Sequence, residues 1–281
     1  LLEAEKLPFV SIIVPTYYEE DNIERCLESL SKLDYPKKEI IVVDGGSKDS
    51  TVSRAMRYTD TVIVDSTLPE GWIGKSYGCH LGYQVAKGDL FLFTDADTYH
   101  EPESLKHAVS TLKGSNSMML TLLPYQKAER WYEYLLGYYF FLSWLVAGAI
   151  EEINDVNNPN AFLAIGQYLL FEKECYEGLN GHVSIYSSIV EDLALAKRCE
   201  KMGYKMHFMK SRKLVKCRMH PGGIQSLLEG FNKSIIGGFQ TLSKRRVMYA
   251  TFWIINASLW TCEKLYFPQI GPLGSEQGKV N

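Results

Sequence analysis

Two aspartates, Asp95 and Asp97, stand one residue apart directly after the apolar run LFLFT at 90–94. Where a chain turns at the end of a strand, alternate residues can direct both carboxylates into one crevice. Paired oxygen ligands suit Mg²⁺ or Mn²⁺, which can also hold a diphosphate and assist its departure as a Lewis acid. The competing interpretation is a pair of solvated turn aspartates, because aspartate is common after strands.

A second acidic pair, Glu191 and Asp192, precedes a predicted helix over 193–202. Ser188 stands three residues before Glu191, which fits a capping box and gives Glu191 a structural explanation. Asp192 has no such explanation, and a carboxylate beside a reacting hydroxyl is the usual general base in sugar transfer. For that role, burial or neighbouring carboxylates would have to raise the pKa of Asp192.

Two further segments could hold a nucleotide or its phosphates. The loop DGGSKDST at 44–51 combines glycines, which let backbone amides approach a ligand, with Asp44, which can accept from a base or ribose. Lys75 lies at a predicted helix start, where its ammonium group and helix amides can meet a phosphate together. The structural alternatives are a helix cap at Asp49 or Ser50 and an ordinary surface lysine.

Short apolar, often β-branched runs predict the strands that position these residues. The strands are expected at 10–14, 39–43, 62–64, 89–94 and 118–123, with helices between them at 21–30, 75–87 and 102–112 and with Asp21 as the first cap. This alternation predicts an α/β fold with a doubly wound, mostly parallel sheet. Ligands of such sheets bind beyond the carboxyl ends of the strands, where the polar segments 15–21, 44–51 and 95–98 fall.

Composition narrows the class of partner. A net charge of −3 argues against nucleic acid, and 46% hydrophobic with 22% charged residues is typical of a globular protein. The six cysteines form no C-x-x-C pair, which indicates reduced thiols in a cytosol-facing protein. Lone histidines such as His182 and His220 could bind a metal or an acceptor, and packing or surface roles are favoured for them.

Taken in order, four segments resemble the motifs of the family 2 glycosyltransferases, which have the Rossmann-like GT-A fold. They are VSIIVPTYYEE at 10–20, IVVDGGSKDST at 41–51, LFLFTDAD at 90–97 and VEDLALAKR at 190–198. Tyr18 replaces the usual asparagine of the first motif, and Gly45 replaces an aspartate of the second. Segments 69–76, 166–171, 181–182 and 230–233 resemble the branch that acts on hydrophobic acceptors, including carotenoid- and hopanoid-associated membrane enzymes.

The resemblance implies an inverting, metal-dependent transfer from a nucleotide diphospho-sugar, commonly a UDP-sugar, to a hydroxyl or carboxyl group of a hydrophobic or lipid-linked acceptor. It assigns the catalytic base to Asp192 and the Mg²⁺ or Mn²⁺ site to Asp95 and Asp97. The nucleotide site is expected to comprise Pro15, Thr16, Tyr17, Glu19, Asp44, Gly46, Lys75, Asp95 and Ala96. Acceptor-side or supporting roles are expected for Gln167, His182, Glu191 and Lys233. No Q-x-x-R-W motif of processive synthases is evident, so a single transfer is expected.

Long uncharged segments predict contact with a membrane. The run at 134–150 has the minimum length for crossing a bilayer, 224–239 has apolar residues at helical spacing, and KRR at 244–246 precedes a second uncharged run at 247–262. These segments predict C-terminal amphipathic and apolar helices and a membrane-associated protein whose catalytic domain faces the cytoplasm. Helices packed against the domain are the alternative.

The expected domains are a catalytic domain over 1–223, a membrane-associating helical segment over 224–267 and a tail over 268–281. Within the catalytic domain, a nucleotide-binding half is expected over about 1–124 and an acceptor-binding half over about 125–223. The chain begins with leucine, so a preceding segment is left open. The letters GPLGS at 271–275 resemble a protease-site remnant of an expression vector.

Two other functions fit parts of the same pattern. A nucleotidyltransferase would also use an α/β sheet with paired aspartates, but it normally has a glycine-rich basic loop near the first strand, where 15–21 is acidic here. An inactive membrane-bound binding protein would not need Asp95, Asp97 and Asp192 together. A glycosyltransferase is therefore the favoured prediction.

Overall fold

The computed structural model describes residues 7–134, 164–219, 223–225, 227–230 and 248. The chain divides into two compact units, Leu1–Thr241 and Leu242–Asn281, and every element described below belongs to the first. The predicted uncharged segments at 134–150 and 247–262 lie outside the described residues apart from Tyr134 and Met248. The same holds for His220, Lys233, 231–239 and the tail at 268–281.

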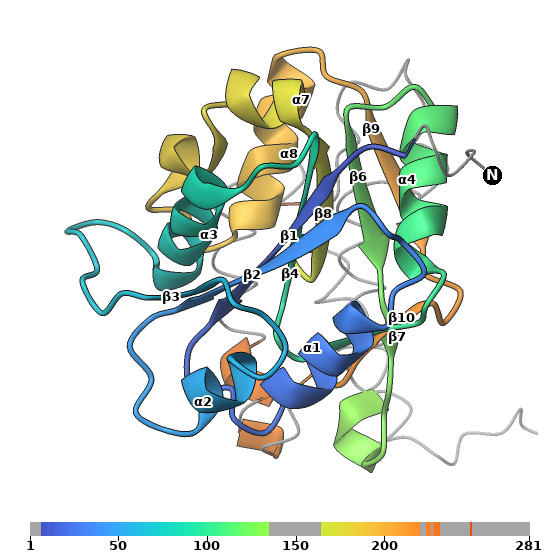
Figure 1. Cartoon of the computed structure of the whole chain (residues 1–281). Helices are drawn as coiled ribbons and strands as arrows, with labels where there is room; N and C mark the ends of the chain where they lie inside the picture. The colour runs from blue at the N-terminus through green and yellow to red at the C-terminus, as the bar shows by residue number, and fades with distance from the viewer. Residues whose placement is uncertain (1–6, 135–163, 220–222, 226, 231–247, 249–281) are drawn as a thin grey trace, which may run out of the picture. The chain divides into compact units, whose positions relative to one another are not determined.

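Seven strands form the central sheet, in the order β3-β2-β1-β4-β8-β6-β9 (Figure 1). They are β1 (Val10–Thr16), β2 (Lys38–Asp44), β3 (Val62–Val64), β4 (Leu90–Thr94), β6 (Met119–Leu123), β8 (Tyr168–Glu172) and β9 (Met206–Lys210). Neighbouring strands are parallel except where β8 pairs antiparallel with β4 and β6. The predicted doubly wound, mostly parallel α/β sheet is confirmed.

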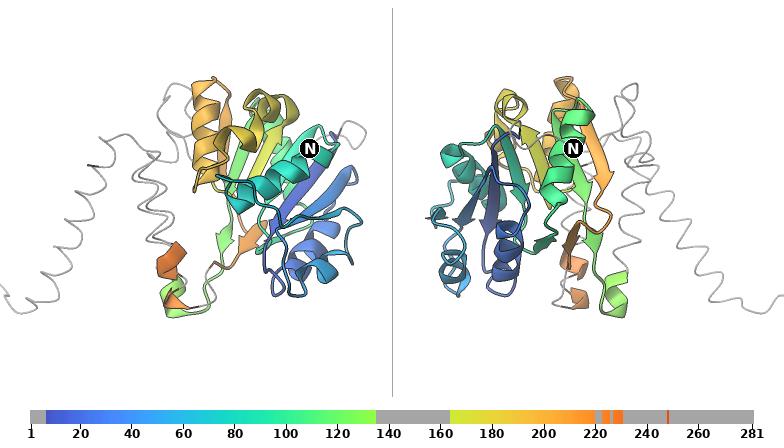
Figure 2. Two further views of the ribbon diagram at one scale, coloured as in Figure 1. Left: turned by 90° about the vertical axis from the view of Figure 1, so that its left-hand side faces the viewer. Right: turned by 45° about the vertical axis from the view of Figure 1, so that its right-hand side comes forward.

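Alternate residues of the strands face opposite sides of the sheet and form two cores. Ile12 packs into one core and Ile13 into the other, as do Leu92 and Phe93. The first core is covered by α1 (Ile23–Ser31), the short α2 (Thr51–Ala55) and α4 (Ser104–Gly114), and the second by α3 (Gly74–Val85), α7 (Lys173–Gly178) and α8 (Glu191–Lys201). In the right-hand view of Figure 2 the blue β1 lies between the teal α3 and the green α4.

A small second sheet includes the strand that follows β4 in the chain. The turn between β4 and that strand carries the two aspartates. The strands of this sheet are β5 (Thr98–His100), β10 (Val215–Cys217) and β7 (Tyr125–Gln126), in that order. The hydroxyl of Thr98 donates to the carbonyl oxygen of Asp95 at 2.7 Å, and the backbone N–H of Thr98 donates to the same oxygen at 3.3 Å. The chain therefore turns tightly between β4 and β5.

The predicted caps of two helices are wrong. The helix α1 begins at Ile23 with Asn22 at its N-cap position and no side-chain cap, so Asp21 does not cap it. The helix α8 begins at Glu191 with Val190 at its N-cap position. The hydroxyl of Ser188 donates to the carbonyl oxygen of Val190 at 3.2 Å and forms no capping box. Glu191 is therefore not part of a cap, and its carboxylate forms an ion pair with Lys75.

Ser50 also occupies an N-cap position, at the start of α2, without a side-chain cap. The carboxylate of Asp49 instead accepts the backbone N–H of Thr51 at 3.0 Å, so it bonds the first turn from one residue further back. A capping role was the structural alternative for this loop. Asp49 fulfils it by bonding the first turn of α2, and the Ser50 side chain does not. This capping role does not compete with the predicted nucleotide-binding role, which concerns Asp44 and Gly46 at the beginning of the same loop.

The described cysteines are all free thiols, as the sequence predicted: Cys26, Cys79, Cys175, Cys199 and Cys217. Within the described part of the chain, no helix has the length and apolar character needed to cross a bilayer. The membrane prediction depends mainly on residues outside that part, so it stays a prediction.

Candidate active site

A cavity of about 570 Å³ opens at the carboxyl ends of β1, β2 and β4. It is the place where ligands of doubly wound sheets bind. Of the predicted nucleotide-binding residues, all except Gly46 line this cavity: Pro15, Thr16, Tyr17, Glu19, Asp44, Lys75, Asp95 and Ala96. Asp97 lines it as well. The segments that follow three strands therefore meet in one space large enough for a nucleotide.

Asp44 organises the loop after β2. Its carboxylate accepts the backbone N–H groups of Gly46 at 2.9 Å and Ser47 at 2.7 Å, and the hydroxyls of Ser47 at 2.6 Å and Thr16 at 3.1 Å. These four bonds fill the acceptor positions of a carboxylate. Gly46 adopts a φ of +91°, which favours glycine, and does not line the cavity. A direct bond from Asp44 to a base or ribose would have to replace one of these four.

Part of the cavity wall was not predicted from the sequence, and it includes Asp65, Ser66, Leu68 and Tyr77. Asp65 directly follows β3, its backbone N–H donates to the carbonyl oxygen of Asp44 at 2.9 Å, and its carboxylate accepts the Tyr77 hydroxyl at 3.3 Å. The position of Asp65 at a strand end could have identified it by the same rule that identified Asp44.

The two aspartates after β4 fit a divalent cation. Asp97 Oδ1 is buried and has no hydrogen-bond partner among the described residues. Burial, followed by the charges of Asp95 and Glu19, raises the pKa of Asp97 to about 7. A bound cation would satisfy this oxygen and relieve the repulsion. Since no group of three or more His, Cys, Asp or Glu side chains forms a metal site within the described residues, diphosphate oxygens and water would complete the coordination.

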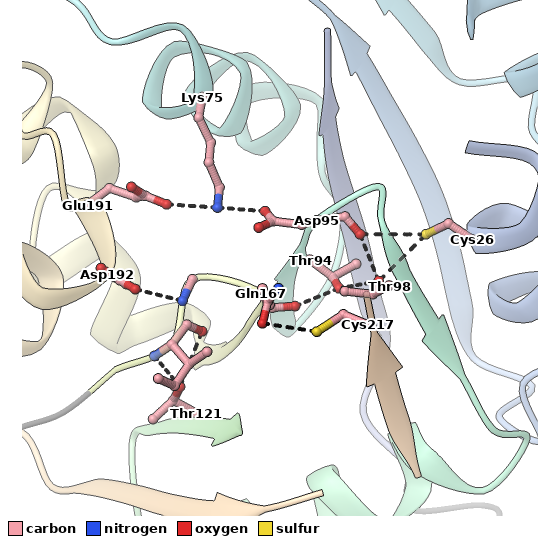
Figure 3. A network of polar contacts seen from close by, with 12 residues as sticks. Cys26, Lys75, Thr94, Asp95, Thr98, Thr121, Gln167, Glu191, Asp192 and Cys217 are labelled. Atoms are coloured by element: carbon pink, nitrogen blue, oxygen red, sulfur yellow. Dashed lines mark hydrogen bonds and ion pairs between the residues drawn. The ribbon is translucent and has the colours of Figure 1, made fainter. Parts of the chain in front are cut away.

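Lys75 joins the cavity to the second acidic pair (Figure 3). Its Nζ lies 2.6 Å from Asp95 Oδ1 and 2.8 Å from Glu191 Oε1. Burial alone would lower the pKa of Lys75, but the charges of Asp95 and Glu191 outweigh it and hold that pKa well above its usual value. Burial would likewise raise the pKa of Glu191, and the Lys75 charge lowers it instead. Both groups are therefore ionised at neutral pH.

Asp192 lies beside this pair in the first turn of α8. One carboxylate oxygen accepts the backbone N–H of Gly166 at 2.7 Å, and the other accepts that of Leu193 at 2.7 Å. Burial and then the neighbouring charge of Glu191 raise the pKa of Asp192 to about 7. A carboxylate that is held in place and titrates near neutral pH is suited to general-base chemistry. No role for Gly166 was predicted from the sequence.

Gln167 and His182 are not among the residues that line the cavity. Gln167 is buried, and its backbone carbonyl oxygen accepts a hydrogen bond from the Thr94 hydroxyl at 2.8 Å. His182 is buried too, its Nδ1 is 2.7 Å from the Tyr176 hydroxyl, and burial lowers its pKa to about 3, so it is neutral. The acceptor-side or supporting roles predicted for both residues stay predictions.

A Rossmann-like sheet with one reversed strand, an acidic pair after β4 in a nucleotide-sized cavity, and a second carboxylate, Asp192, next to the ion pair of Lys75 and Glu191 are features of a GT-A glycosyltransferase. Residues 11–179 match the family described as "Glycosyl transferase family 2". The chain therefore belongs to glycosyl transferase family 2 and is a glycosyltransferase, as its four sequence motifs predicted.

Curated relatives include two enzymes named 4,4'-diaponeurosporenoate glycosyltransferase. That of Staphylococcus haemolyticus is 25% identical over 258 residues, which cover 90% of this chain and 68% of the relative. That of Staphylococcus aureus (strain USA300) is 28% identical over 282 residues, which cover 96% of this chain and 74% of the relative. The likeness thus extends beyond the 11–179 match into the later part of the chain.

Solved structures share the fold at lower identity. A mannosyltransferase from Pyrobaculum calidifontis, in complex with GDP-Man and Mn²⁺, has a TM-score of 0.56 and 22% identity over 83% of this chain and 66% of that structure. Glucosyl-3-phosphoglycerate synthase from Mycobacterium tuberculosis, in complex with Mg²⁺ and UDP, has a TM-score of 0.57 and 19% identity over 83% and 78%. These similarities confirm the predicted GT-A fold.

Proposed function

We propose that this chain transfers a single sugar from a nucleotide diphospho-sugar, commonly a UDP-sugar, to a hydroxyl or carboxyl group of a hydrophobic or lipid-linked acceptor. The observation that carries the proposal is the position of Lys75, which pairs with Asp95 on the cavity side and with Glu191 on the other. Because Glu191 is the neighbour of Asp192, this lysine connects the nucleotide-sized cavity to the candidate base.

The proposed reaction is a direct displacement with inversion. Asp192 takes the proton of the acceptor hydroxyl as the hydroxyl oxygen attacks the anomeric carbon. The bond from that carbon to the diphosphate breaks on the opposite face, and the diphosphate leaves with the electron pair. Lys75, held at the cavity wall by two carboxylates, supplies a positive charge beside the group that leaves.

Asp95 and Asp97 would hold Mg²⁺ or Mn²⁺. The fit is supported by the buried Asp97 Oδ1, which has no hydrogen-bond partner among the described residues, and by the mutual repulsion of the two carboxylates. When bound, the cation supplies Lewis-acid stabilisation of the charge on the diphosphate. Two proteins of the same fold, solved with GDP-Man and Mn²⁺ and with UDP and Mg²⁺, support a divalent cation as the partner of the nucleotide.

The hydrophobic acceptor is supported by the name of the curated relatives, whose acceptor is a carotenoid acid by that name. Exposed aromatic side chains support contact with a membrane. Trp131 and Tyr134, in the 3₁₀ turn η2 (Trp131–Tyr134), are 73% and 69% exposed, and both residue types favour membrane interfaces. We propose that the protein associates with a membrane and that its catalytic domain faces the cytoplasm.

The test of the function is a panel of nucleotide diphospho-sugars with an apolar alcohol or carboxylic acid, in Mn²⁺ or Mg²⁺. Release of the nucleotide diphosphate and formation of a glycosylated acceptor of inverted configuration are expected. A retained configuration would overturn the displacement mechanism. Release of pyrophosphate from a nucleoside triphosphate would instead indicate a nucleotidyltransferase, and binding without turnover would indicate an inactive binding protein.

The membrane proposal has its own test, which is sedimentation with anionic phospholipid vesicles. The double variant Trp131→Ala/Tyr134→Ala is expected to sediment less than the wild type. Met56→Ala removes an apolar side chain of similar exposure, 59%, at the end of α2 and serves as the control. Equal sedimentation of all three proteins would remove the proposed role of Trp131 and Tyr134.

A further inference from the structure

Gly166 lies at the point where the charged groups of the site converge. A Cβ atom at this position would meet Glu191 Oε1 at 2.9 Å, Lys75 Nζ at 3.1 Å and Asp192 Oδ2 at 3.3 Å. The two carboxylates and the ammonium group therefore close directly over a backbone that carries no side chain. Its own N–H points at Asp192 and donates to it at 2.7 Å.

The conformation of the backbone does not require glycine here. Gly166 is not among the residues with a left-handed φ, so alanine could adopt its conformation without strain. What the position requires is space. This distinguishes Gly166 from Gly46 and Gly71, where a positive φ by itself disfavours any other residue.

The backbone around Gly166 is also fixed on both sides. The N–H of Ile165 donates to the Thr121 hydroxyl at 2.9 Å, and the Thr94 hydroxyl donates to the carbonyl oxygen of Gln167 at 2.8 Å (Figure 3). Thr121 belongs to β6 and Thr94 to β4, the two neighbours of β8 in the sheet. The segment before β8 is thus tied to both flanking strands and cannot easily withdraw from the charged groups.

We propose that Gly166 is a positioning residue for sugar transfer, and this rests on the proposed function. Its N–H orients the carboxylate of Asp192 toward the acceptor, and its missing side chain is the space in which Lys75 and Glu191 pair. Because both neighbours of Gly166 are anchored to the sheet, the geometry of the base is set by β4 and β6 through this short segment.

The substitution Gly166→Ala tests whether the site requires a residue without a side chain at this position. The new methyl group would press on side-chain tips and on no backbone atom, so we expect the fold to survive. Lys75 and Glu191 form an ion pair, and Asp192 is the chain neighbour of Glu191, so a displacement of these groups moves the Asp192 carboxylate as well. The expected result is a kcat for transfer lowered about 10- to 100-fold, because small misplacements of reacting groups cost that much. The KM for the donor and the affinity for UDP should change much less than kcat, because the charge of Lys75 is kept and its Nζ can shift by a few tenths of an ångström.

Two further variants separate positioning from general damage. Thr121→Val keeps the size of the side chain but removes the anchor of Ile165, and we expect it to lower kcat in the same direction with an unchanged donor KM. Gly114→Ala adds a methyl group at the end of α4, where nothing lies within 4 Å, and should behave as the wild type. Gly166→Ala with wild-type kcat, or with kcat and UDP affinity lost together, would overturn the proposal.

Hydrolysis of the donor without an acceptor distinguishes failure of this inference from failure of the proposed function. Water that attacks the sugar also needs a base, so Gly166→Ala should hydrolyse the donor more slowly than the wild type. If the wild type hydrolyses the donor but glycosylates no apolar acceptor, the proposed acceptor is wrong while the hydrolysis ratio still tests Gly166. Equal hydrolysis rates in both proteins would count against Gly166 alone.

Discussion

The ammonium nitrogen of Lys75 lies 2.8 Å from a carboxylate oxygen of Glu191, and this ion pair connects α3 with the first turn of α8. The same nitrogen contacts Asp95 at 2.6 Å, so one side chain reaches from the candidate metal site to the neighbour of the candidate base. Its removal should therefore affect both donor binding and the stability of the fold.

Lys75→Met is expected to lower kcat/KM for the donor about 100-fold, because the charge beside the diphosphate is lost. It should also lower the free energy of unfolding by about 2 kcal/mol, since Glu191 is left buried without its partner. Donor kinetics and urea unfolding measure the two effects. Lys106→Met is the control, because Lys106 is as exposed as Lys75, at 30%, and pairs at 3.6 Å with the exposed Asp34. Equal effects of the two substitutions would contradict the assignment.

Asp192→Asn should lower kcat for transfer about 1,000-fold, the range of a lost general base, and leave UDP affinity within about twofold. In the wild type, kcat/KM for a hydroxyl acceptor should rise with pH and level off above about 7, because Asp192 has its pKa raised to about 7 and must lose its proton to act. A pH–rate profile between pH 5 and pH 9 measures this, at about half-unit steps. A flat profile, or an active asparagine variant, would exclude Asp192 as the base.

Mn²⁺ binding in the presence of UDP should weaken as the pH falls. A cation must displace the proton from Asp97, whose pKa is about 7, so affinity at about pH 6 should be roughly tenfold lower than at about pH 8. Calorimetric titration of Mn²⁺ measures the difference. Asp97→Asn should abolish Mn²⁺-dependent UDP binding, and Asp34→Asn, which changes an exposed aspartate at an ion pair, should not. Retained Mn²⁺ dependence in Asp97→Asn would remove Asp97 from the metal site.

Tyr18 has a φ of +56°, a left-handed conformation that asparagine tolerates better than tyrosine. Asparagine, the residue of the motif that this segment resembles, therefore suits the backbone at position 18 better than tyrosine does. Tyr18→Asn should therefore raise the free energy of unfolding by about 0.5–1 kcal/mol, as measured by urea unfolding. Tyr18→Phe keeps the unfavourable conformation and should bring no gain. A loss of stability in Tyr18→Asn would show that the ring contact with Tyr17, at 4.7 Å between centroids, contributes more than the strain costs.

Features that depend on neighbours in the chain were predicted well. The strands that end at Thr16, Asp44 and Thr94 could be located from their apolar runs, and the polar residues after them from the rule that ligands bind at strand ends. The same rule would have found Asp65 after β3. Local caps were predicted poorly: within the described residues Asp21 does not cap α1, and the hydroxyl of Ser188 bonds the carbonyl oxygen of Val190 instead of capping α8.

Features that depend on the antiparallel strand β8 could not be predicted from residues adjacent in the sequence. Gly166 gains its importance because β8 runs antiparallel between β4 and β6 and brings the residue before it against the first turn of α8. Lys75 and Glu191 are 116 positions apart, and each had a sufficient local explanation, a helix start for one and a capping box for the other. Only the packed structure shows that they pair.

The sequence by itself determined the class of sheet, the acidic pair Asp95 and Asp97 at a strand end, and the family, because these follow from apolar periodicity and from motifs of a few adjacent residues. The tertiary structure decided how the pieces act together: the pairing of Lys75 with two carboxylates, the raised pKa of Asp192 and the need for space at Gly166. The physical reason is that charge coupling, burial and steric fit depend on distances between atoms that lie far apart along the chain.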